Sequence, residues 1–255
     1  MEKKKLLNIG VSTGKYGEFT KKIIELARVK KGGYVCVANV HMLIEAYNDP
    51  DYSRAINNAD IITPDGMPIA ILLKLLYGKK QDRVAGMDLL PDLLLLMERQ
   101  KLSVFFYGST NKSLRKVISG ISSEYPELTI SGTIAPPFGD IPPDIIEGHF
   151  AEIRKTDPDI IFIVLGCPKQ EKLMAKMSDK VNGIMIGIGG AVPVFTGEIK
   201  RAPVWMQKYS LEWLFRLIQE PRRLWRRYLY TNIKFILLAF IEVIKRKILK
   251  RTDSL

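Results

Sequence analysis

Residues 159–180 read DIIFIVLGCPKQEKLMAKMSDK, where an apolar run is followed directly by a mixed polar and apolar one. The run 159–166 is almost entirely apolar, which is typical of a β-strand buried on both faces of a sheet. Gly166 ends this run and Pro168 opens the next, because a proline fits the first turn of a helix. A buried strand joined to a helix is the unit of a parallel α/β sheet, so this stretch predicts that fold class.

The same alternation of strand-like and helix-like runs continues through most of the chain. Further strand-like runs occupy residues 33–40, 59–64, 102–108, 128–136 and 183–190. Helix-like runs occupy residues 41–48, 67–78, 86–100, 111–125 and 142–156. Continuous apolar strands joined by helices indicate a largely parallel sheet that is covered on both faces. We therefore predict a Rossmann-like α/β catalytic domain over residues 1–197.

Charge is distributed unevenly along the 255 residues, whose formal net charge is +12. Residues 198–255 contain fourteen Lys and Arg against five Asp and Glu, whereas the rest of the chain is nearly balanced. The same segment is helix-like and rich in aromatic residues. We predict that residues 198–255 form a basic, helical appendage, with a nucleic acid, an anionic lipid or a phosphorylated substrate as its partner.

Cysteine usage and apolar run lengths limit the class of protein. Cys36 and Cys167 lie far apart and have no Cys-x-x-Cys spacing, so we interpret them as reduced thiols. The apolar run 235–241 is much shorter than the roughly 20 residues that a transmembrane helix needs. The basic N-terminus is followed by too short an apolar run to resemble a signal peptide. We therefore expect a protein of a reducing compartment with no membrane-spanning helix.

Two residues at predicted strand ends are candidates for a ligand site, because ligands gather at the carboxyl ends of parallel strands. Asp65 follows the run 59–64 in the sequence IITPDGMP. Spacing alone explains Asp65 equally well as a turn residue or as a general base, with Gly66 letting a ligand approach closely in the second case. Asn39 also follows an apolar run, and there the pattern favours a helix N-cap.

Three other strand ends give weaker signals. Gly108 precedes the helix-like run 111–125, whose free N–H groups could hold a phosphate. Lys169 and Gln170 lie in the first turn of a helix, where they could face a nucleotide. The run GIGGAVPVFTG has Val192 where a dinucleotide fingerprint needs glycine or alanine, so we reject a nicotinamide cofactor.

Two Asp-Pro-Asp triplets, at residues 49–51 and 157–159, resemble the Asp-x-Asp metal signature of sugar-nucleotide enzymes. That signature should follow a strand, whereas here one triplet ends a helix and the other precedes a strand. We interpret both triplets as turns and predict no essential metal or other cofactor.

The arginines of the appendage have a regular spacing. Arg216, Arg223 and Arg226 would share one helix face if the helix continued through Pro221. Such a face is either solvated or a clamp for a diphosphate, which suits the forked donors of arginine. Aromatic residues lie among them, namely Trp205, Trp213, Trp225, Tyr228 and Tyr230. A basic helix with aromatic residues favours a membrane surface over a nucleic acid as its partner.

Seven motifs in this order resemble the WecG/TagA/CpsF family of bacterial glycosyltransferases over about residues 8–230. They are VANVHM, ADIITPDGMPIA, RVAGMDL, FFYGS, PDIIFIVLGCPKQE, GIGGAVPVFTGEIKRAP and LEWLFRLIQEPRRLWRRYL. The resemblance implies an inverting transfer of an N-acetylmannosamine-type sugar from a UDP-sugar to a polyprenyl-diphosphate-linked sugar such as GlcNAc. It places this reaction at the cytoplasmic face of the bacterial plasma membrane, in the synthesis of teichoic acid, common antigen, capsule or exopolysaccharide. It implies no strict metal site.

The resemblance also assigns roles to residues. It implies that Asp65 is the catalytic base. The candidate substrate-binding residues on these motifs are Asn39, Gly66, Met67, Arg83, Gly108, Gly166, Lys169, Gln170, Glu171, Gly189, Arg216, Arg223 and Arg226. One position departs from the family pattern, because Val37 stands where many members have a threonine, and its missing hydroxyl bears on the donor sugar.

Two alternatives remain open from the sequence. One is a non-catalytic module that binds a nucleotide sugar or a lipid diphosphate. The other is a nucleic-acid-binding protein, but the body of the chain lacks a basic groove pattern. A homo-oligomer is also considered, because an exposed basic and aromatic tail can pack in a subunit interface.

Overall fold

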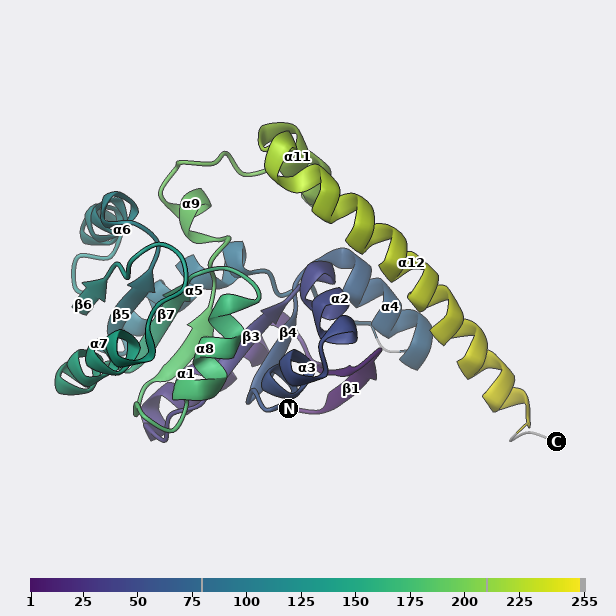
Figure 1. Ribbon diagram of the computed structural model, residues 1–255, viewed down its shortest axis with the longest axis horizontal. Helices are drawn as coiled ribbons and strands as arrows, with labels where there is room; N and C mark the ends of the chain where they lie inside the picture. Colours follow the sequence, from purple (N-terminus) through teal and green to yellow (C-terminus); the bar gives the residue numbers. More distant parts are fainter. Residues whose placement is uncertain (79, 210, 253–255) are drawn as a thin grey trace.

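The computed structural model describes residues 1–78, 80–209 and 211–252, and it is built around one six-stranded parallel sheet (Figure 1). The strand order is β4-β3-β8-β7-β5-β6, and every neighbouring pair is parallel. The strands are β3 (Tyr34–Ala38), β4 (Ile61–Pro64), β5 (Ser103–Gly108), β6 (Thr129–Ile134), β7 (Ile160–Val164) and β8 (Ile184–Gly187). The predicted α/β class is therefore confirmed.

Successive side chains of the central strands enter two different cores, one on each face of the sheet. In β7, Ile161 and Ile163 belong to the first core, while Ile160 and Phe162 belong to the second, and all four are fully buried. This is why these strands are continuous apolar runs rather than alternating ones.

Helices cover both faces of the sheet. Those that pack into the first core are α2 (Val40–Asn48), α3 (Pro50–Asn57), α4 (Met67–Tyr77), α7 (Pro143–Thr156) and α8 (Lys169–Met177). Those that pack into the second core are α1 (Tyr16–Val29), α5 (Gly86–Arg99) and α6 (Asn111–Glu124). The strand-to-helix turns therefore meet at the carboxyl edge of the sheet, where a site can form.

The sequence patterns do not predict the N-terminal hairpin of β1 (Lys3–Leu6) and β2 (Ile9–Ser12). Its strands pair in antiparallel fashion, and Oγ of Ser12 accepts a 3.0 Å hydrogen bond from the backbone N–H of Ile62 in β4. The hairpin thus covers the β4 edge of the sheet, which would otherwise be open to pairing with another chain.

The C-terminal segment consists of α9 (Val192–Phe195), α10 (Val204–Lys208), α11 (Glu212–Gln219) and α12 (Pro221–Thr252). The long helix α12 runs diagonally down one side of the molecule and lies along α2 and α4 (Figure 1). Leu224, Thr231 and Phe235 of α12 are buried, and Phe235 belongs to the first core. The appendage therefore shares a core with the parallel sheet.

The chain does not continue as one helix through Pro221. Helix α11 ends at Gln219, Glu220 has φ −130° and ψ 56°, and α12 begins at Pro221. Proline suits the first position of a new helix because its missing N–H is not needed there. The condition under which Arg216, Arg223 and Arg226 were expected to share one face is therefore not met.

Candidate active site

Asp65 directly follows β4, at the carboxyl edge of the sheet. Its backbone N–H donates a 2.8 Å hydrogen bond to the carbonyl of Ala38, which ends the neighbouring strand β3. Gly66 has φ +107°, a conformation that a residue with a side chain rarely adopts, and it starts α4. The same turn therefore places the Asp65 carboxylate at the edge of the sheet. Asp65 can be a turn residue and a general base at once, so the two interpretations do not exclude each other.

The protein raises the pKa of Asp65 from 3.8 to about 7. Desolvation of the half-buried carboxylate is the main cause, and the negative charge of Glu212 adds to it. Arg83 opposes the shift by favouring the ionised form. Among the described residues, no hydrogen bond to the Asp65 carboxylate is present, so its oxygens are available to a ligand. A carboxylate with a pKa near 7 can take a proton from a substrate at neutral pH.

Arg83 is held beside Asp65 by the end of β4. The Thr63 hydroxyl donates to the carbonyl of Val84 at 3.1 Å, and the backbone N–H of Val84 donates to the carbonyl of Pro64 at 3.0 Å. These two bonds fix the loop that carries Arg83. Arg83 therefore lies close enough for its charge to act on Asp65, and its role in substrate binding stays a prediction.

An ion-pair network connects Arg83 to the C-terminal segment. Nη1 of Arg83 pairs with Oε2 of Glu212 on α11, and its Nη2 donates to Asp88 of α5 at 2.8 Å. Arg201 pairs with the other oxygen of Asp88. The side chains of Arg83 and Glu212 are only 16% and 14% exposed, so this contact seats α11 over the site.

The ends of β7 and β8 are joined by one side-chain oxygen. Oε1 of Gln170 accepts hydrogen bonds of 3.1 Å from the backbone N–H groups of both Gly166 and Gly189. A Cβ at Gly189 would lie 2.7 Å from the nitrogen of Gly166, so only glycine fits there. Gln170 therefore fixes the glycine-rich edge that faces the site.

Glu171 lies in the core behind Gln170. Its side chain has no exposed surface and accepts hydrogen bonds from Nε2 of Gln170 at 2.7 Å and from the Tyr52 hydroxyl at 2.9 Å. Burial raises the pKa of Glu171. In this geometry Glu171 orients Gln170 from within the core.

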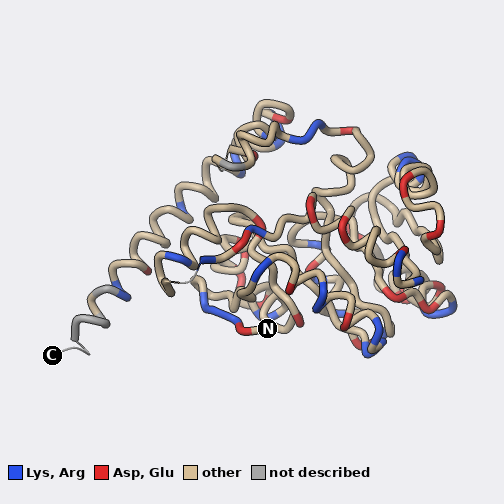
Figure 2. Tube along the Cα trace, turned by 180° about the vertical axis from the view of Figure 1, so that it is seen from behind, with Lys and Arg blue, Asp and Glu red and all other residues tan. Residues whose placement is uncertain are grey.

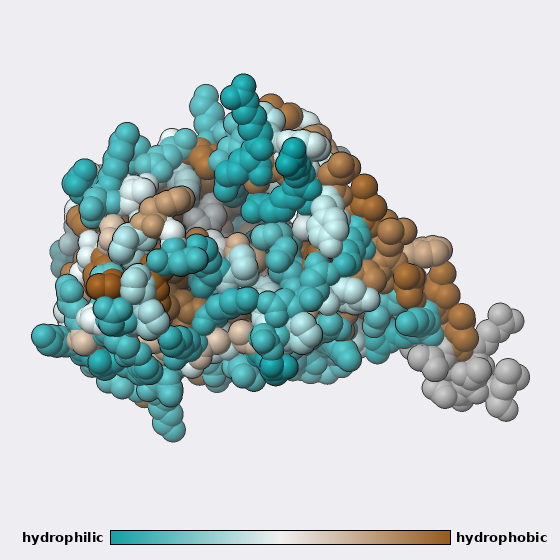
Figure 3. Space-filling model, viewed as in Figure 1, coloured by the Kyte–Doolittle hydropathy of each residue, from teal (hydrophilic) through white to brown (hydrophobic). Residues whose placement is uncertain are grey.

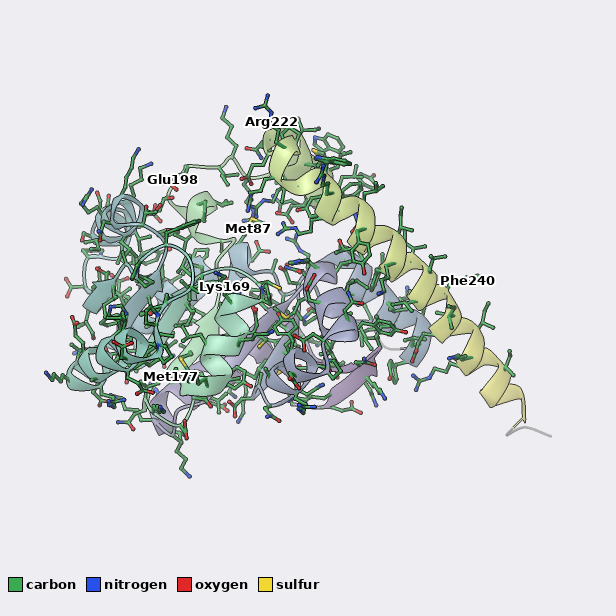
Figure 4. All side chains as sticks on the ribbon, viewed as in Figure 1. Met87, Lys169, Met177, Glu198, Arg222 and Phe240 are labelled. Carbon is green, nitrogen blue, oxygen red and sulfur yellow. The ribbon has the colours of Figure 1, made fainter. Side chains whose placement is uncertain are left out.

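Four other predicted site residues lie around the same edge. Oδ1 of Asn39 accepts a 3.1 Å hydrogen bond from the N–H of Met42, which confirms the N-cap interpretation. Gly108 ends β5 beside β7, and half-buried Met67 begins α4. Lys169 is exposed and pairs with Asp140 at 2.9 Å. In Figure 4, Lys169 and Met87 of α5 lie on the side of the molecule below α11.

The three arginines predicted as a clamp are not equivalent. Arg216 is 16% exposed, and its Nη1 donates to the carbonyl of Gly190 at 3.3 Å. Arg223 and Arg226 are exposed; Arg223 pairs with Glu220 at 2.5 Å, and Arg226 lies 5.2 Å from the Trp225 ring. Arg216 therefore lines the site, while the other two extend from the start of α12.

The sequence patterns did not identify Arg227, which turns inward from α12. Its charge acts on His41 and Cys167, and its Nε is buried without a hydrogen-bond partner among the described residues. Burial and Arg227 lower the pKa of His41 to about 4, so this imidazole is neutral at physiological pH. The spacing of the buried residues Leu224 and Thr231 places position 227 on the inner face, and this signal could have revealed it.

Three more residues near the site were missed, namely Tyr52, Asp88 and Glu212. Val37, where a hydroxyl was expected, is 6% exposed and packs in the second core, so its side chain does not open to the site. In the described ranges, no group of three or more His, Cys, Asp and Glu side chains is arranged to hold a metal ion. The prediction that no metal is essential stays a prediction.

The arrangement combines one carboxylate, backbone N–H groups and arginines at a single edge. Figure 3 shows the surface recessed near this edge, between the segment of α9 and that of α11. Such a site can remove a proton from a hydroxyl group on one side and stabilise an anionic leaving group on the other.

The chain is similar to known proteins over most of its length. The model of the glycosyl transferase WecG/TagA/CpsF family matches residues 4–249. An N-acetylglucosaminyldiphosphoundecaprenol N-acetyl-beta-D-mannosaminyltransferase of Bacillus subtilis (strain 168) is 34% identical over 201 residues, which cover 78% of this chain and 76% of that protein. A protein of the same name from Bacillus spizizenii (strain ATCC 23059 / NRRL B-14472 / W23) is 32% identical over 207 residues, with the same shares covered. The chain is therefore an enzyme of the WecG/TagA/CpsF family of glycosyltransferases.

Proposed function

We propose that the chain transfers an N-acetylmannosamine-type sugar from a UDP-sugar to a polyprenyl-diphosphate-linked GlcNAc. The names of the two Bacillus relatives support the transferred sugar and the lipid-linked acceptor. The observation that carries the proposal is Asp65, a carboxylate with a pKa of about 7 at the carboxyl edge of the sheet, flanked by Arg83 and Arg216.

The proposed reaction is a single displacement with inversion at the anomeric carbon. The acceptor hydroxyl oxygen attacks that carbon as Asp65 takes the hydroxyl proton. The bond from the anomeric carbon to the phosphate oxygen breaks, and UDP leaves with the electron pair. A positioned base typically contributes about 10²–10⁴-fold in rate. Charge that develops on UDP would be stabilised by Arg216 and by the backbone N–H groups at the strand ends.

The outer face of α12 supports contact with a membrane. Ile236 and Phe240 are 65% and 64% exposed, and Figure 3 shows an apolar band along this helix. Other exposed apolar residues of α12 are Trp225, Leu229, Ile233, Leu237, Ile241 and Ile244. Figure 2 shows basic residues near both ends of the same helix. None of the helices in the described ranges is sufficiently long and apolar to pass through a bilayer.

We propose that α12 lies on the cytoplasmic face of the plasma membrane as a peripheral contact. A helix with one exposed apolar face and basic residues binds at the interface of an anionic bilayer. This position brings the site to the membrane, where a polyprenyl-linked acceptor is embedded. The basic residues would lie near the lipid headgroups.

The test is an assay of the purified chain with a panel of UDP-sugars and a short-chain polyprenyl-diphosphate-GlcNAc. UDP release that depends on both substrates, with a β-linked product from UDP-N-acetylmannosamine, is the expected result. Binding of donor and acceptor without UDP release would instead support the non-catalytic alternative. Asp65→Asn serves as the matched inactive variant, because it keeps the shape of the side chain.

A further inference from the structure

Glu212 is incompletely paired in the first turn of α11. One of its oxygens pairs with Arg83, while Oε1 is enclosed and has no hydrogen-bond partner in the described part of the chain. Arg83 is also shared, because its second Nη group donates to Asp88 at 2.8 Å. A buried carboxylate with one unpaired oxygen and a shared cation exerts a strong negative field on its surroundings.

Contacts place Glu212 near Asp65, because it pairs with Arg83, and the next residue, Val84, donates a 3.0 Å hydrogen bond to the carbonyl of Pro64, which precedes Asp65. The charges that act on Asp65 come from three places: Arg83 in the loop before α5, Asp88 on α5, and Glu212 with Arg216 on α11. Glu212 has the largest influence among these charges, and Asp88 acts in the same direction. Burial is the main cause of the raised pKa of Asp65, and the two carboxylates add to it more than the two arginines oppose it.

Glu212 reaches Asp65 only because α11 is seated on the body. The Arg83 contact holds the start of α11. At its other end, Gln219 exchanges two 3.1 Å hydrogen bonds with the backbone of Lys200. Removing α11 would remove the Glu212 carboxylate and would also let water reach Asp65, and both changes make Asp65 a stronger acid and a weaker base.

We propose that Glu212 is a positioning residue that acts through Asp65: when α11 is seated, its carboxylate keeps the base able to accept a proton at neutral pH. The proposal rests on the function proposed above, in which Asp65 is the base. It gives the C-terminal segment a chemical role in addition to membrane contact, since α11, which directly precedes the lipid-facing helix α12, sets the state of the base.

The first test measures Asp65 directly, without any reaction. Carboxyl ¹³C NMR titrations are recorded for the full chain, and the Asp65 signal is assigned by its loss in Asp65→Asn. Glu212→Gln should lower the titration midpoint of Asp65 by about one pH unit, a size typical for the loss of a nearby charge. Glu212→Asp, which keeps the charge, should bring the midpoint back towards that of the natural chain.

Glu198→Gln is the matched control. It removes the same charge from the same C-terminal segment, but Glu198 pairs with Ser113 and Lys116 over α6 and is not among the groups that act on Asp65. Figure 4 shows Glu198 on the far side of α9 from α11. The control should leave the titration midpoint of Asp65 unchanged. A shift of the midpoint in both variants would show that the loss of any negative charge in this segment has the same effect.

The second test follows kcat/KM against pH with the donor and acceptor named above. Glu212→Gln should move the acidic limb to lower pH and lower the plateau, because a weaker base transfers the proton less effectively. If the natural chain transfers no sugar, the proposed function fails, while the NMR titration still decides the role of Glu212. An Asp65 midpoint in Glu212→Gln equal to that of the natural chain would overturn the inference, even with full transferase activity.

Discussion

The hydroxyl of Tyr52 donates a 2.9 Å hydrogen bond to Oε2 of Glu171, a carboxylate with no exposed surface. This bond joins α3 to α8 inside the first core. Because Glu171 in turn accepts from Gln170, the pair supports the oxygen that holds Gly166 and Gly189. The glycine edge of the site is thus built on a polar network in the core.

Tyr52→Phe should cost about 1–3 kcal/mol in the free energy of unfolding at neutral pH, because it leaves a buried carboxylate oxygen without its donor. Urea denaturation measures the change. Tyr125→Phe is the matched control, since that hydroxyl makes only a 3.4 Å contact with a backbone carbonyl. Equal losses in the free energy of unfolding of the two variants would show that the Tyr52–Glu171 hydrogen bond stabilises the fold no more than the Tyr125 contact does.

Glu171→Gln should change how stability depends on pH. The folded chain raises the pKa of Glu171 above its ordinary value of 4.5, so the folded state holds this proton more tightly than the unfolded state. The stability that protonated Glu171 contributes is fully present below pH 4.5, its ordinary pKa, and it is lost as the pH rises through the raised pKa of the folded chain. The variant cannot ionise, so its stability relative to the natural chain should increase with pH. Denaturation curves at several pH values above 4.5 test this, and a constant difference would contradict it.

Gly189→Ala should reduce kcat/KM severely, although the variant should still fold. The added Cβ would lie 2.7 Å from the nitrogen of Gly166 and 2.9 Å from Oε1 of Gln170, so the ends of β7 and β8 must separate. Gly148→Ala in α7 is the control, because nothing lies within 4 Å of its Cβ position and alanine favours a helix by about 0.5–1 kcal/mol. Steady-state kinetics and thermal melting distinguish a displaced site from a general loss of stability.

The sequence predicted the central sheet well for a physical reason. Strands such as β7 are buried on both faces, so their apolar runs need no knowledge of their neighbours. The hairpin β1–β2 was missed because its strands have four residues each and the first reads KKKL, so no apolar pattern marks it. The hairpin is stabilised by its contact with the edge of β4, and this contact exists only in the folded chain.

The candidate site was predicted in part. Asp65 directly follows β4, and Gln170 lies in the first turn of α8 after β7, so both positions follow from the alternation of strands and helices. Glu212 could not be found in this way, because its partner Arg83 is 129 residues away and their contact exists only after folding. Arg227 was missed because the spacing argument considered only Arg216, Arg223 and Arg226, whereas the inward position of Arg227 follows from the packing of α12 along α2, where it acts on His41.

Ile236→Gln combined with Phe240→Gln should weaken binding to vesicles that contain anionic lipid. Both side chains are about two-thirds exposed on the outer face of α12, so the change removes apolar contact with lipid and leaves the core intact. Deleting residues 198–255 would be a less clear test, because it also removes the buried residues Leu224 and Phe235. Co-sedimentation with vesicles measures the loss.

The control for α12 changes two exposed apolar residues on the opposite face of the sheet. The control variant combines Val29→Gln on α1 with Leu95→Gln on α5, and both helices pack into the second core. This variant should bind vesicles as the natural chain does. Equal loss in both variants, or unchanged binding by the α12 variant, would count against a membrane contact through α12.

Asp65→Asn should reduce kcat by about 10²–10⁴-fold while UDP binding stays nearly unchanged, because the amide cannot take the proton but keeps the shape of the side chain. In the natural chain, kcat/KM should rise with pH and level off above about 7, where the Asp65 carboxylate is ionised. The variant should lose this acidic limb in its residual activity. Isothermal titration with UDP and a pH–rate profile measure the two effects. Turnover by Asp65→Asn at the natural rate would remove Asp65 from the mechanism, whereas a parallel loss of UDP binding would assign it to the donor site instead.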